Sequence, residues 1–315
     1  MTTPNEIRSK ITSQIVQALE SGSIPWRRPW QISPNASGRP RNVASKKPYS
    51  GVNFLLLALH SMKYGFQSRF YGTFQQWSAL GGKVKSRPVD VEPGDYGCHI
   101  VFYRPVSKTT TNPTTGKEEQ ERFAVLRSYC VFCADQVEGK AVEKYQVQEE
   151  SGGTLPNFAP ADNLIAATGA DIRITGESAF YSVPTPEKSW PNHTGGDYIQ
   201  VPQPQKFISP GAWYGTVFHE IGHWCEPRLD FRPEQNAYAM GELVAEMSAA
   251  FLSTELGIPG GEDMSNHAAY LQSWLRAMKN DVGFIFKAST QASKVVDFIL
   301  SHQKQTQQQT EAEAA

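Results

Sequence analysis

Residues 214–224 of this 315-residue chain read YGTVFHEIGHW, and the apolar spacing around them predicts a helix over residues 213–225. His219 and His223 are four residues apart, so in a helix both imidazoles lie on one face and can point at a common centre. Glu220 lies about 100° further round the helix, where its carboxylate can reach a water molecule held at that centre. An apolar helix buries such polar groups only when they have partners, so the stretch predicts a metal site.

The carboxylates that would complete this site lie on the next predicted helix, over residues 237–256. Eighteen residues separate His223 from Glu242, and Glu246 follows four residues later on the same helix face. This HExxH-x18-E spacing resembles that of Glu-type zincins. The resemblance implies that Glu242 binds the metal and that Glu246 holds a ligating histidine by its other ring nitrogen. The residues alone also allow the reverse assignment of the two glutamates.

Two imidazoles and a carboxylate suit Zn²⁺, although another divalent metal fits the same ligands. In a catalytic site of this kind the zinc lowers the pKa of its water to about 7, and Glu220 accepts the proton as the catalytic base. Position alone makes Tyr238, Arg228 and His193 candidates for the group that stabilises the oxyanion. The motif leaves two alternatives open: a metal bound without hydrolysis, and histidines satisfied by ion pairs in the core.

The charge of the chain is divided between its halves, although the net charge is only −1. Residues 1–104 hold 14 Lys and Arg against 5 Asp and Glu, whereas residues 151–315 hold 10 against 18. Such a basic half favours a polyanion as its partner. Its aromatic residues alternate with cations, the combination that holds single-stranded nucleic acid by stacking and by phosphate contacts. No predicted helix there is rich in the Arg, Asn and Gln that read a duplex groove.

Single-stranded DNA is therefore the predicted partner of the basic half. The candidate contacts are Trp26, Arg27, Arg28, Trp30, Arg41, Lys46, Lys47, Tyr49, Arg69, Trp77, Lys83 and Lys85. For any single aromatic in this set, a place in the hydrophobic core is the more frequent role. The set as a whole, rather than any one ring, carries the prediction.

Periodicity predicts an α+β fold, with an α+β N-terminal domain and a mainly helical C-terminal domain. Helices are expected over residues 4–21, 49–64, 73–80, 161–168, 213–225, 237–256, 265–280 and 284–302. Strands are expected over residues 97–104, 123–132, 172–175, 179–182 and 198–201, with a hairpin tip between 109 and 120. Composition sets the domains: residues 1–148 form the basic domain, 149–160 the linker, 161–302 the metal-binding domain and 303–315 a disordered polar tail.

Cysteine spacing and apolar runs exclude several other classes. Cys130 and Cys133 form a single CxxC in a β-prone stretch without a second ligand pair, so buried, reduced thiols are expected rather than a zinc or redox site. No apolar run approaches the roughly 20 residues that cross a bilayer, and the first residues lack the features of a signal peptide. We therefore expect a cytoplasmic protein with no membrane partner.

Beyond these motifs, most of the chain resembles the ArdC-type antirestriction proteins of conjugative plasmids. The resemblance is carried by IPWRRPW (24–30), YSGVNFLLL (49–57), TFQQW (73–77), GGKVK (81–85), VFCADQ (131–136), DYIQVP (197–202), HEIGHW (219–224), ELVAE (242–246) and AYLQSWLRAMKND (269–281). It implies an N-terminal domain that binds single-stranded DNA, a C-terminal zincin-like metallopeptidase domain, and protection of entering plasmid DNA from restriction. Two features depart from the family pattern: Cys133 stands where Asn is expected, and the stretch 184–196 is longer than expected.

The leading hypothesis is thus a two-domain antirestriction protein, with a single-stranded-DNA-binding domain followed by a zinc metallopeptidase domain of the gluzincin type. One alternative is a DNA-binding antirestriction module whose metal site is structural. The other is a general cytosolic metallopeptidase whose basic domain binds acidic peptides. The sequence does not indicate the peptide substrate or the oligomeric state.

Overall fold

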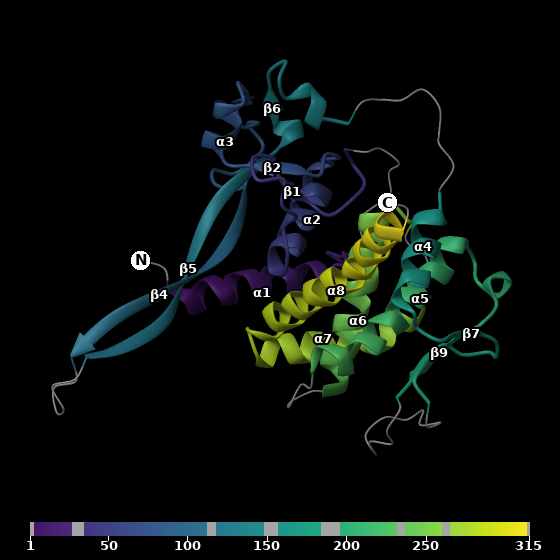
Figure 1. The fold of residues 1–315 in the computed structure, drawn as a ribbon. Coiled ribbons are helices and arrows are strands. Elements are labelled where there is room, and N and C mark those ends of the chain that lie inside the picture. Colours follow the sequence, from purple (N-terminus) through teal and green to yellow (C-terminus); the bar gives the residue numbers. More distant parts are fainter. Residues whose placement is uncertain are drawn as a thin grey trace.

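A computed structural model describes residues 3–26, 35–111, 118–147, 157–183, 196–231, 237–259 and 265–313 of the chain. A body of packed helices carries a long β-hairpin on one side and a small three-stranded sheet on the other (Figure 1). The mixture of helices and sheets agrees with the predicted α+β class.

The N-terminal part combines three helices with short strands and one long hairpin. Its helices are α1 (Pro4–Glu20), α2 (Val52–Tyr64) and α3 (Phe74–Ala79). Its strands are β1 (Arg41–Asn42), β2 (Phe70–Gly72), β3 (Lys83–Val84), β4 (Cys98–Thr111), β5 (Glu118–Cys133) and β6 (Val137–Glu138). The strands form a four-stranded sheet in the order β1-β2-β5-β4 and a two-stranded sheet, β3-β6. Two 3-10 helices, η1 (Ala134–Gln136) and η2 (Glu143–Tyr145), lie before and after β6.

Local signals explain where these helices begin and end. The Thr3 hydroxyl accepts a hydrogen bond from the Glu6 backbone N–H at 3.2 Å, and the Glu6 carboxylate accepts one from the Thr3 backbone N–H at 2.7 Å. This reciprocal cap satisfies two donors that an isolated helix end leaves unpaired. Thr73 and Gln76 form the same cap at α3. α2 ends at Gly65, whose φ of 69° lies in the left-handed region that glycine adopts without steric cost.

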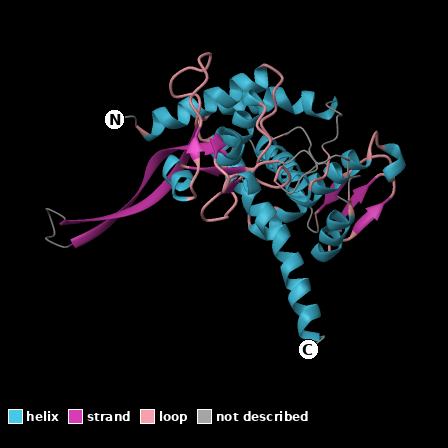
Figure 2. Cartoon of the chain, turned by 90° about the horizontal axis from the view of Figure 1, so that it is seen from above, coloured by secondary structure: helices cyan, strands magenta, loops and turns pink. Residues whose placement is uncertain are grey.

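The β4–β5 hairpin is longer than the sequence predicts. The two strands pair antiparallel from Cys98↔Val131 to Thr111↔Glu118, and the hairpin projects from the body as an arm (Figures 1 and 2). Residues 109–111 and 118–120, expected in the hairpin tip, belong to this ladder instead. The reason is local, because the run Thr109–Thr111 is β-branched and favours extended backbone.

The prediction of buried thiols in a strand is confirmed for Cys133 and only partly for Cys130. Cys130 and Cys133 both lie in β5 as free thiols; Cys133 is buried and Cys130 half-buried. Burial raises the pKa of the Cys130 thiol, which keeps it protonated and unreactive near neutral pH.

The C-terminal part contains the remaining sheet and most of the helical body. Its helices are α4 (Ala159–Thr168), α5 (Pro210–Cys225), α6 (Ala237–Leu256), α7 (Ser265–Asn280) and α8 (Phe284–Glu313), with 3-10 turns η3 (Pro204–Lys206) and η4 (Pro227–Leu229). Its strands are β7 (Ile172–Ile174), β8 (Phe180–Ser182) and β9 (Tyr198–Val201). β9 is the central strand, parallel to β7 and antiparallel to β8.

α8 is longer than predicted. It was expected to end at residue 302, yet the helix continues to Glu313, and the prediction of a disordered tail from residue 303 is wrong over this range. Polar composition does not oppose a helix here, because Gln, Lys, Glu and Ala are good helix formers and the segment has neither Gly nor Pro. The last turns extend away from the body (Figure 2). None of the helices in the described part of the chain combines the length and apolar character needed to cross a bilayer.

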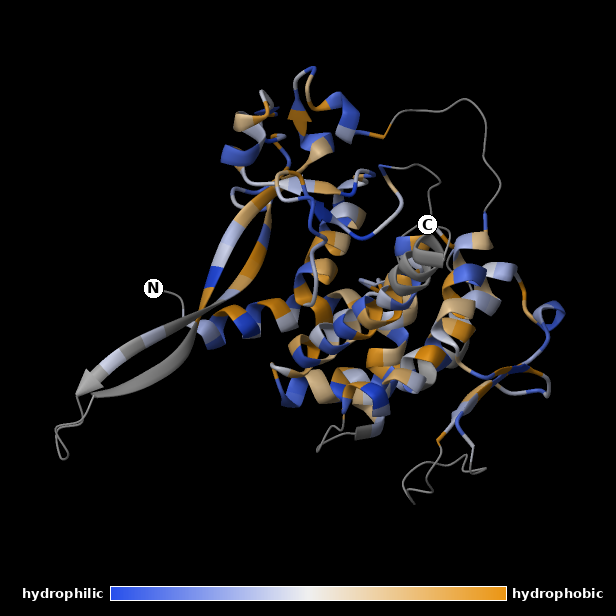
Figure 3. Ribbon diagram, viewed as in Figure 1, coloured by the Kyte–Doolittle hydropathy of each residue, from blue (hydrophilic) through white to orange (hydrophobic). Residues whose placement is uncertain are grey.

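The two parts of the chain share one hydrophobic core. Phe54 of α2 packs on Phe251 of α6 with ring centroids 3.9 Å apart, and Trp26 meets Trp274 of α7 at 6.0 Å. Figure 3 shows apolar residues concentrated where α1 and α2 meet the C-terminal helices. The predicted boundary at residues 149–160 therefore divides the sequence without dividing the core.

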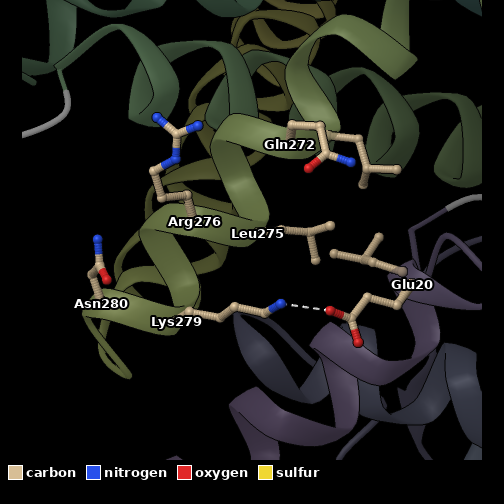
Figure 4. Close-up of a pocket in the computed structure, with 8 residues that line it drawn as sticks. Glu20, Gln272, Leu275, Arg276, Lys279 and Asn280 are labelled. Carbon is tan, nitrogen blue, oxygen red and sulfur yellow. Dashed lines mark hydrogen bonds and ion pairs between the residues drawn. The ribbon is translucent and has the colours of Figure 1, made fainter.

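An open hollow of about 430 Å³ lies where the two parts of the chain meet, between the end of α1 and α7 (Figure 4). The ion pair between Lys279 Nζ and Glu20 Oε1, 2.6 Å long, bridges the two helices at its edge. Both side chains are about half exposed, so the pair stabilises the junction little. No residue of the predicted metal site lines this hollow.

The shared core makes a stability prediction. We expect Phe251→Ala to destabilise the protein by about 3–5 kcal/mol, because it leaves a cavity against Phe54. Hydrogen exchange should then accelerate in both α2 and α6. Phe74→Ala is the matched control, since Phe74 is 57% exposed and its truncation should change stability by no more than about 0.5 kcal/mol. Loss of protection confined to the C-terminal helices would contradict a common core.

Candidate metal centre and DNA-binding surface

The metal centre depends on a close crossing of α5 and α6. α5 begins after Ser209, whose hydroxyl accepts a hydrogen bond from the Ala212 backbone N–H at 3.2 Å. At the crossing, a Cβ on Gly222 would lie 2.9 Å from the Cα of Ala245. Only glycine therefore allows the two backbones to approach this closely. The approach brings Glu242 of α6 over the histidines of α5.

The side chains of His219, His223 and Glu242 converge on one point. The two Nε2 atoms are 3.1 Å apart, and they lie 3.5 Å and 3.7 Å from the Glu242 carboxylate oxygens. Ligands of a tetrahedral ion with bonds of about 2.0–2.1 Å are separated by about 3.3–3.4 Å. The three residues are thus already spaced as a divalent metal requires, and their ligand atoms all lie within 4.8 Å of one another.

The outer nitrogen of each imidazole faces a second carboxylate. His223 Nδ1 is 2.9 Å from Glu226 Oε1, and His219 Nδ1 is 3.9 Å from Glu246 Oε2. Carboxylates in this position fix the ring orientation and make the inner nitrogen a better ligand. Of the two glutamates on α6, Glu242 faces the inner nitrogens and Glu246 an outer one, an arrangement that favours Glu242 as the ligand.

Glu226 is a site residue that the sequence interpretation missed. It follows His223 by three residues, a spacing that places both on one side of a helical turn and could have suggested the contact. A Cβ on Gly241 would lie 3.1 Å from Glu226 Oε1, so the absence of a side chain at position 241 leaves room for this carboxylate.

Glu220 lies beside the cluster without taking part in it. Its side chain is buried, with 7% exposed, and within the described part of the chain its carboxylate makes no hydrogen bond or ion pair. Its charge contributes to raising the pKa of both histidines, so it is close to them. A buried carboxylate left free beside a set of metal ligands is placed to contact a water molecule on the metal.

Without a metal, the carboxylates hold protons on the imidazoles. Burial alone would lower the pKa of His219, but Glu242 and Glu246 raise it well above its usual value. Burial would also lower the pKa of His223, but Glu226 outweighs this effect, so the pKa is raised. The Glu242 pKa is lowered in turn, because the histidines counter the effect of burial.

These shifts predict how metal affinity depends on pH. A metal binds only neutral imidazole, and both histidine pKa values are raised above 6.5, so protons compete with the metal already near neutral pH. We expect the apparent affinity to fall steadily as the pH drops from 8 to 6, by about tenfold per pH unit for each proton displaced. Competition with a chromogenic chelator measures it. A constant affinity over this range would contradict the raised pKa values.

Glu226→Gln tests the missed residue in the same assay. At pH 8 it should weaken metal binding by about 10- to 100-fold, because His223 loses its carboxylate partner. Glu138→Gln, an exposed substitution in β6, serves as the matched control and should leave the affinity unchanged.

The residues proposed for oxyanion stabilisation differ in their surroundings. Arg228 is fully engaged: it donates to the Trp224 carbonyl at 2.7 Å and to Asp197 at 2.6 Å, and stacks 3.6 Å from the Trp224 ring centroid. It therefore joins the end of α5 to the residue before β9. Tyr238 is 55% exposed, one helical turn before Glu242, with its hydroxyl 2.9 Å from that of Tyr270. His193 lies outside the described residues.

Comparison with known proteins agrees with this geometry. Residues 5–132 match the family model of the N-terminal domain of anti-restriction factor ArdC, and residues 159–291 match that of a zincin-like metallopeptidase domain. The metal-free crystal structure of antirestriction protein ArdC from plasmid R388 superposes with a TM-score of 0.73 at 32% identity, covering 95% of this chain and 98% of that one. The chain belongs to the ArdC antirestriction family.

Other relatives extend the comparison. The Mn(II)-bound structure of the same R388 protein gives a TM-score of 0.67 at 31% identity over 94% of this chain and 97% of that one. Protein y4eC of Sinorhizobium fredii is 31% identical over 314 residues, which cover 97% of this chain and 95% of y4eC. DNA primase TraC of Escherichia coli is 32% identical over 97% of this chain, but that match spans only 28% of TraC. Most of the primase therefore has no counterpart in this ArdC-type chain.

Three aromatic residues predicted to stack on DNA are buried in the ArdC-type fold, and the prediction is wrong for them. Trp26 and Trp77 are 1% and 0% exposed, and Tyr49 is 6% exposed. Trp77 Nε1 donates to the Phe132 carbonyl at 2.9 Å, and the Tyr49 hydroxyl accepts from Asn42 at 2.9 Å. None of the three offers a ring face to a base.

The predicted cations are more accessible. Lys46, Lys47, Lys83 and Lys85 are exposed, and Arg41 and Arg69 are half-buried. Arg27, Arg28 and Trp30 lie outside the described residues.

The exposed rings of the N-terminal part are others: Phe74 of α3 and, on the β4–β5 arm, Phe102, Tyr103 and Tyr129. Phe102 and Tyr129 are 52% and 42% exposed and meet edge to face at 5.9 Å. Arg127 is paired with Phe102 in the ladder and is also exposed. The alternation of strands 97–104 and 123–132 could have identified these outward positions, which the charge pattern alone did not.

Proposed function

We propose that this chain protects entering plasmid DNA from restriction, binding single-stranded DNA through its N-terminal part and cleaving peptide bonds with its C-terminal part. The peptidase proposal rests on one observation above all: three ligand atoms converge while a buried carboxylate beside them is left without a partner. The description of the R388 relative as an antirestriction protein supports this biological role over that of a general peptidase.

Zinc is the metal that we propose for His219, His223 and Glu242. Two imidazoles with one carboxylate, at tetrahedral spacing, is a common zinc ligand set, although the R388 relative has been crystallised with Mn(II). When bound, zinc would supply Lewis-acid polarisation of the scissile carbonyl and acidify a water molecule. Glu226 and Glu246 would fix the orientation of the imidazole rings of His223 and His219.

In this proposal Glu220 takes the proton of the attacking water and delivers it to the leaving amine. Its position one residue after the first ligand, and its lack of a protein partner, suit this transfer. Tyr238 is the better candidate to stabilise the oxyanion, because it is exposed and its hydroxyl, which contacts that of Tyr270, also interacts with Glu242, whereas Arg228 is held by an ion pair with Asp197.

Glu220→Gln tests the catalytic proposal. It should keep the fold and the metal and lower hydrolysis of a labelled unfolded protein by about 10²- to 10⁴-fold. Glu242→Ala should lose the metal as well, as measured by elemental analysis. Glu177→Gln, exposed in the same half of the chain, is the control and should retain activity. Full activity in Glu220→Gln would refute the assignment of the base.

A structural metal site is the second candidate, favoured by the burial of the cluster between α5 and α6. His223 and Glu242 are only 6% and 8% exposed, so a metal there would also hold the two helices together. The same Glu220→Gln variant separates the candidates in a conjugation assay. Protection that survives in this variant while Glu242→Ala abolishes it would identify a structural metal.

The DNA-binding proposal is supported by the charge of residues 1–104 and by the rings exposed on the arm. The double variant Phe102→Ala/Tyr129→Ala should weaken binding of a single-stranded oligonucleotide by about 1–3 kcal/mol for each stacked base. Fluorescence anisotropy at low salt measures this. Phe74→Ala, which removes an exposed ring from α3, provides the comparison. Equal effects of the two variants would exclude a specific role of the arm.

A further inference from the structure

In the described part of the chain, arginines of the N-terminal part meet acidic residues of the C-terminal helices at one place. Arg39 is 4% exposed; its backbone N–H and Nε lie 2.9 Å and 3.4 Å from Glu255 Oε2, and its Nη1 lies 3.0 Å from Asp297. Arg41 Nη2 binds the other oxygen of Glu255 at 2.8 Å. We call this place, where Arg39 and Arg41 meet Glu255 of α6 and Asp297 of α8, the seam. The arginines there neutralise both carboxylates.

Arg69 brings a third guanidinium to the same place without a carboxylate of its own. It lies 5.3 Å from the Phe70 ring centroid, and a Cβ on Gly38 would overlap its Nη1. Among the residues described, it forms no ion pair, and its Nε, like that of Arg41, is buried without a hydrogen-bond partner. Burial is the main cause that lowers the pKa of Arg69; the charge of Arg41 lowers it further, and Glu255 opposes both.

Lys46 adds an exposed fourth cation on the solvent side. A tight turn fixes it with φ of 59°, and its backbone carbonyl accepts a hydrogen bond from Arg41 at 3.3 Å. Its Nζ lies 2.9 Å from the Tyr145 hydroxyl and 5.8 Å from the Phe70 ring centroid. Arg69 and Lys46, neither of which pairs with a carboxylate among the described residues, therefore both lie against the Phe70 ring.

Four cations and two carboxylates meet at this half-buried site, so the described residues leave two positive charges there without a carboxylate. We propose that Arg69, with Arg41 and Lys46, binds a backbone phosphate of single-stranded DNA at this seam. The inference rests on the proposed DNA binding and assigns it a phosphate site. Guanidinium groups suit phosphate oxygens. The net charge of the N-terminal part and the rings exposed on the arm favour a nucleic acid over an acidic protein.

The site uses both halves of the chain. Glu255 and Asp297 hold Arg39 and Arg41 in place from the C-terminal helices, so the phosphate would be bound where the two parts join. A phosphate contact carries no base information, so its loss should weaken binding equally for different sequences.

The test compares Arg69→Gln with the full-length wild type, using oligo(dT) and oligo(dA) over a range of salt concentrations. Loss of one phosphate contact should reduce the slope of log K against log[salt] by about 0.7 and weaken both oligonucleotides by about five- to tenfold. Lys46→Gln, an exposed substitution that should not disturb folding, should act in the same direction. Arg276→Gln on α7 removes the same charge from another face and should leave the slope unchanged.

The outcomes separate this inference from the function on which it rests. If the wild type fails to bind either oligonucleotide at low salt, the DNA-binding proposal itself fails. If the wild type binds but Arg69→Gln and Lys46→Gln keep its salt slope, DNA binding stands and the phosphate site at the seam is overturned. Competition by an acidic peptide, abolished by Arg69→Gln while oligonucleotide binding is retained, would assign the site to a protein partner instead.

Discussion

The contact of Gly222 with Ala245 sets the distance between α5 and α6, and the metal centre exists only at that distance. A side chain at position 222 would push the helices apart and carry Glu242 away from the two imidazoles. Gly241, on the other helix, leaves the space that Glu226 needs behind His223. One glycine on each helix thus permits the inner ligand set and the outer carboxylate to form together. Helix propensity alone would oppose both glycines, so packing has overridden it.

α6 connects this centre to the rest of the molecule. Glu242 and Glu246 lie near its beginning, Phe251 packs on Phe54 of the N-terminal part, and Glu255 binds two arginines near its end. From Glu242 to Glu255 the helix rises about 20 Å, at about 1.5 Å per residue. A single rigid element therefore carries one metal ligand, core contacts and the glutamate that binds Arg39 and Arg41. The two matched domains are consequently one packed unit, in which neither end of α6 can shift without the other.

The sequence predicted those features that depend on spacing along one helix or one strand. The apolar period located the main helices, and the i, i+4 spacing placed His219 and His223 together on one face of α5, where Glu242 of α6 joins them. Features set by contacts between distant segments could not be read in this way. Trp26 and Trp77 alternate with cations in the sequence, but only the packing of α1, α7 and β5 reveals that they are buried. Glu226 was missed because it lies outside the HExxH-x18-E spacing, whose only following carboxylate at the expected position is Glu246.

The shared core places the basic part of the chain directly beside the acidic part. Residues 151–315 are acidic overall, so a polyanion would be repelled from most of the C-terminal surface. At the seam, however, Arg39 and Arg41 neutralise Glu255 and Asp297, which removes the repulsion where α6 and α8 approach the basic half. Arg69 then remains as a cation that forms no ion pair with any carboxylate in the described chain. The acidic half therefore confines a bound strand to the basic face, and the paired arginines allow that face to extend up to the helices that carry the metal centre.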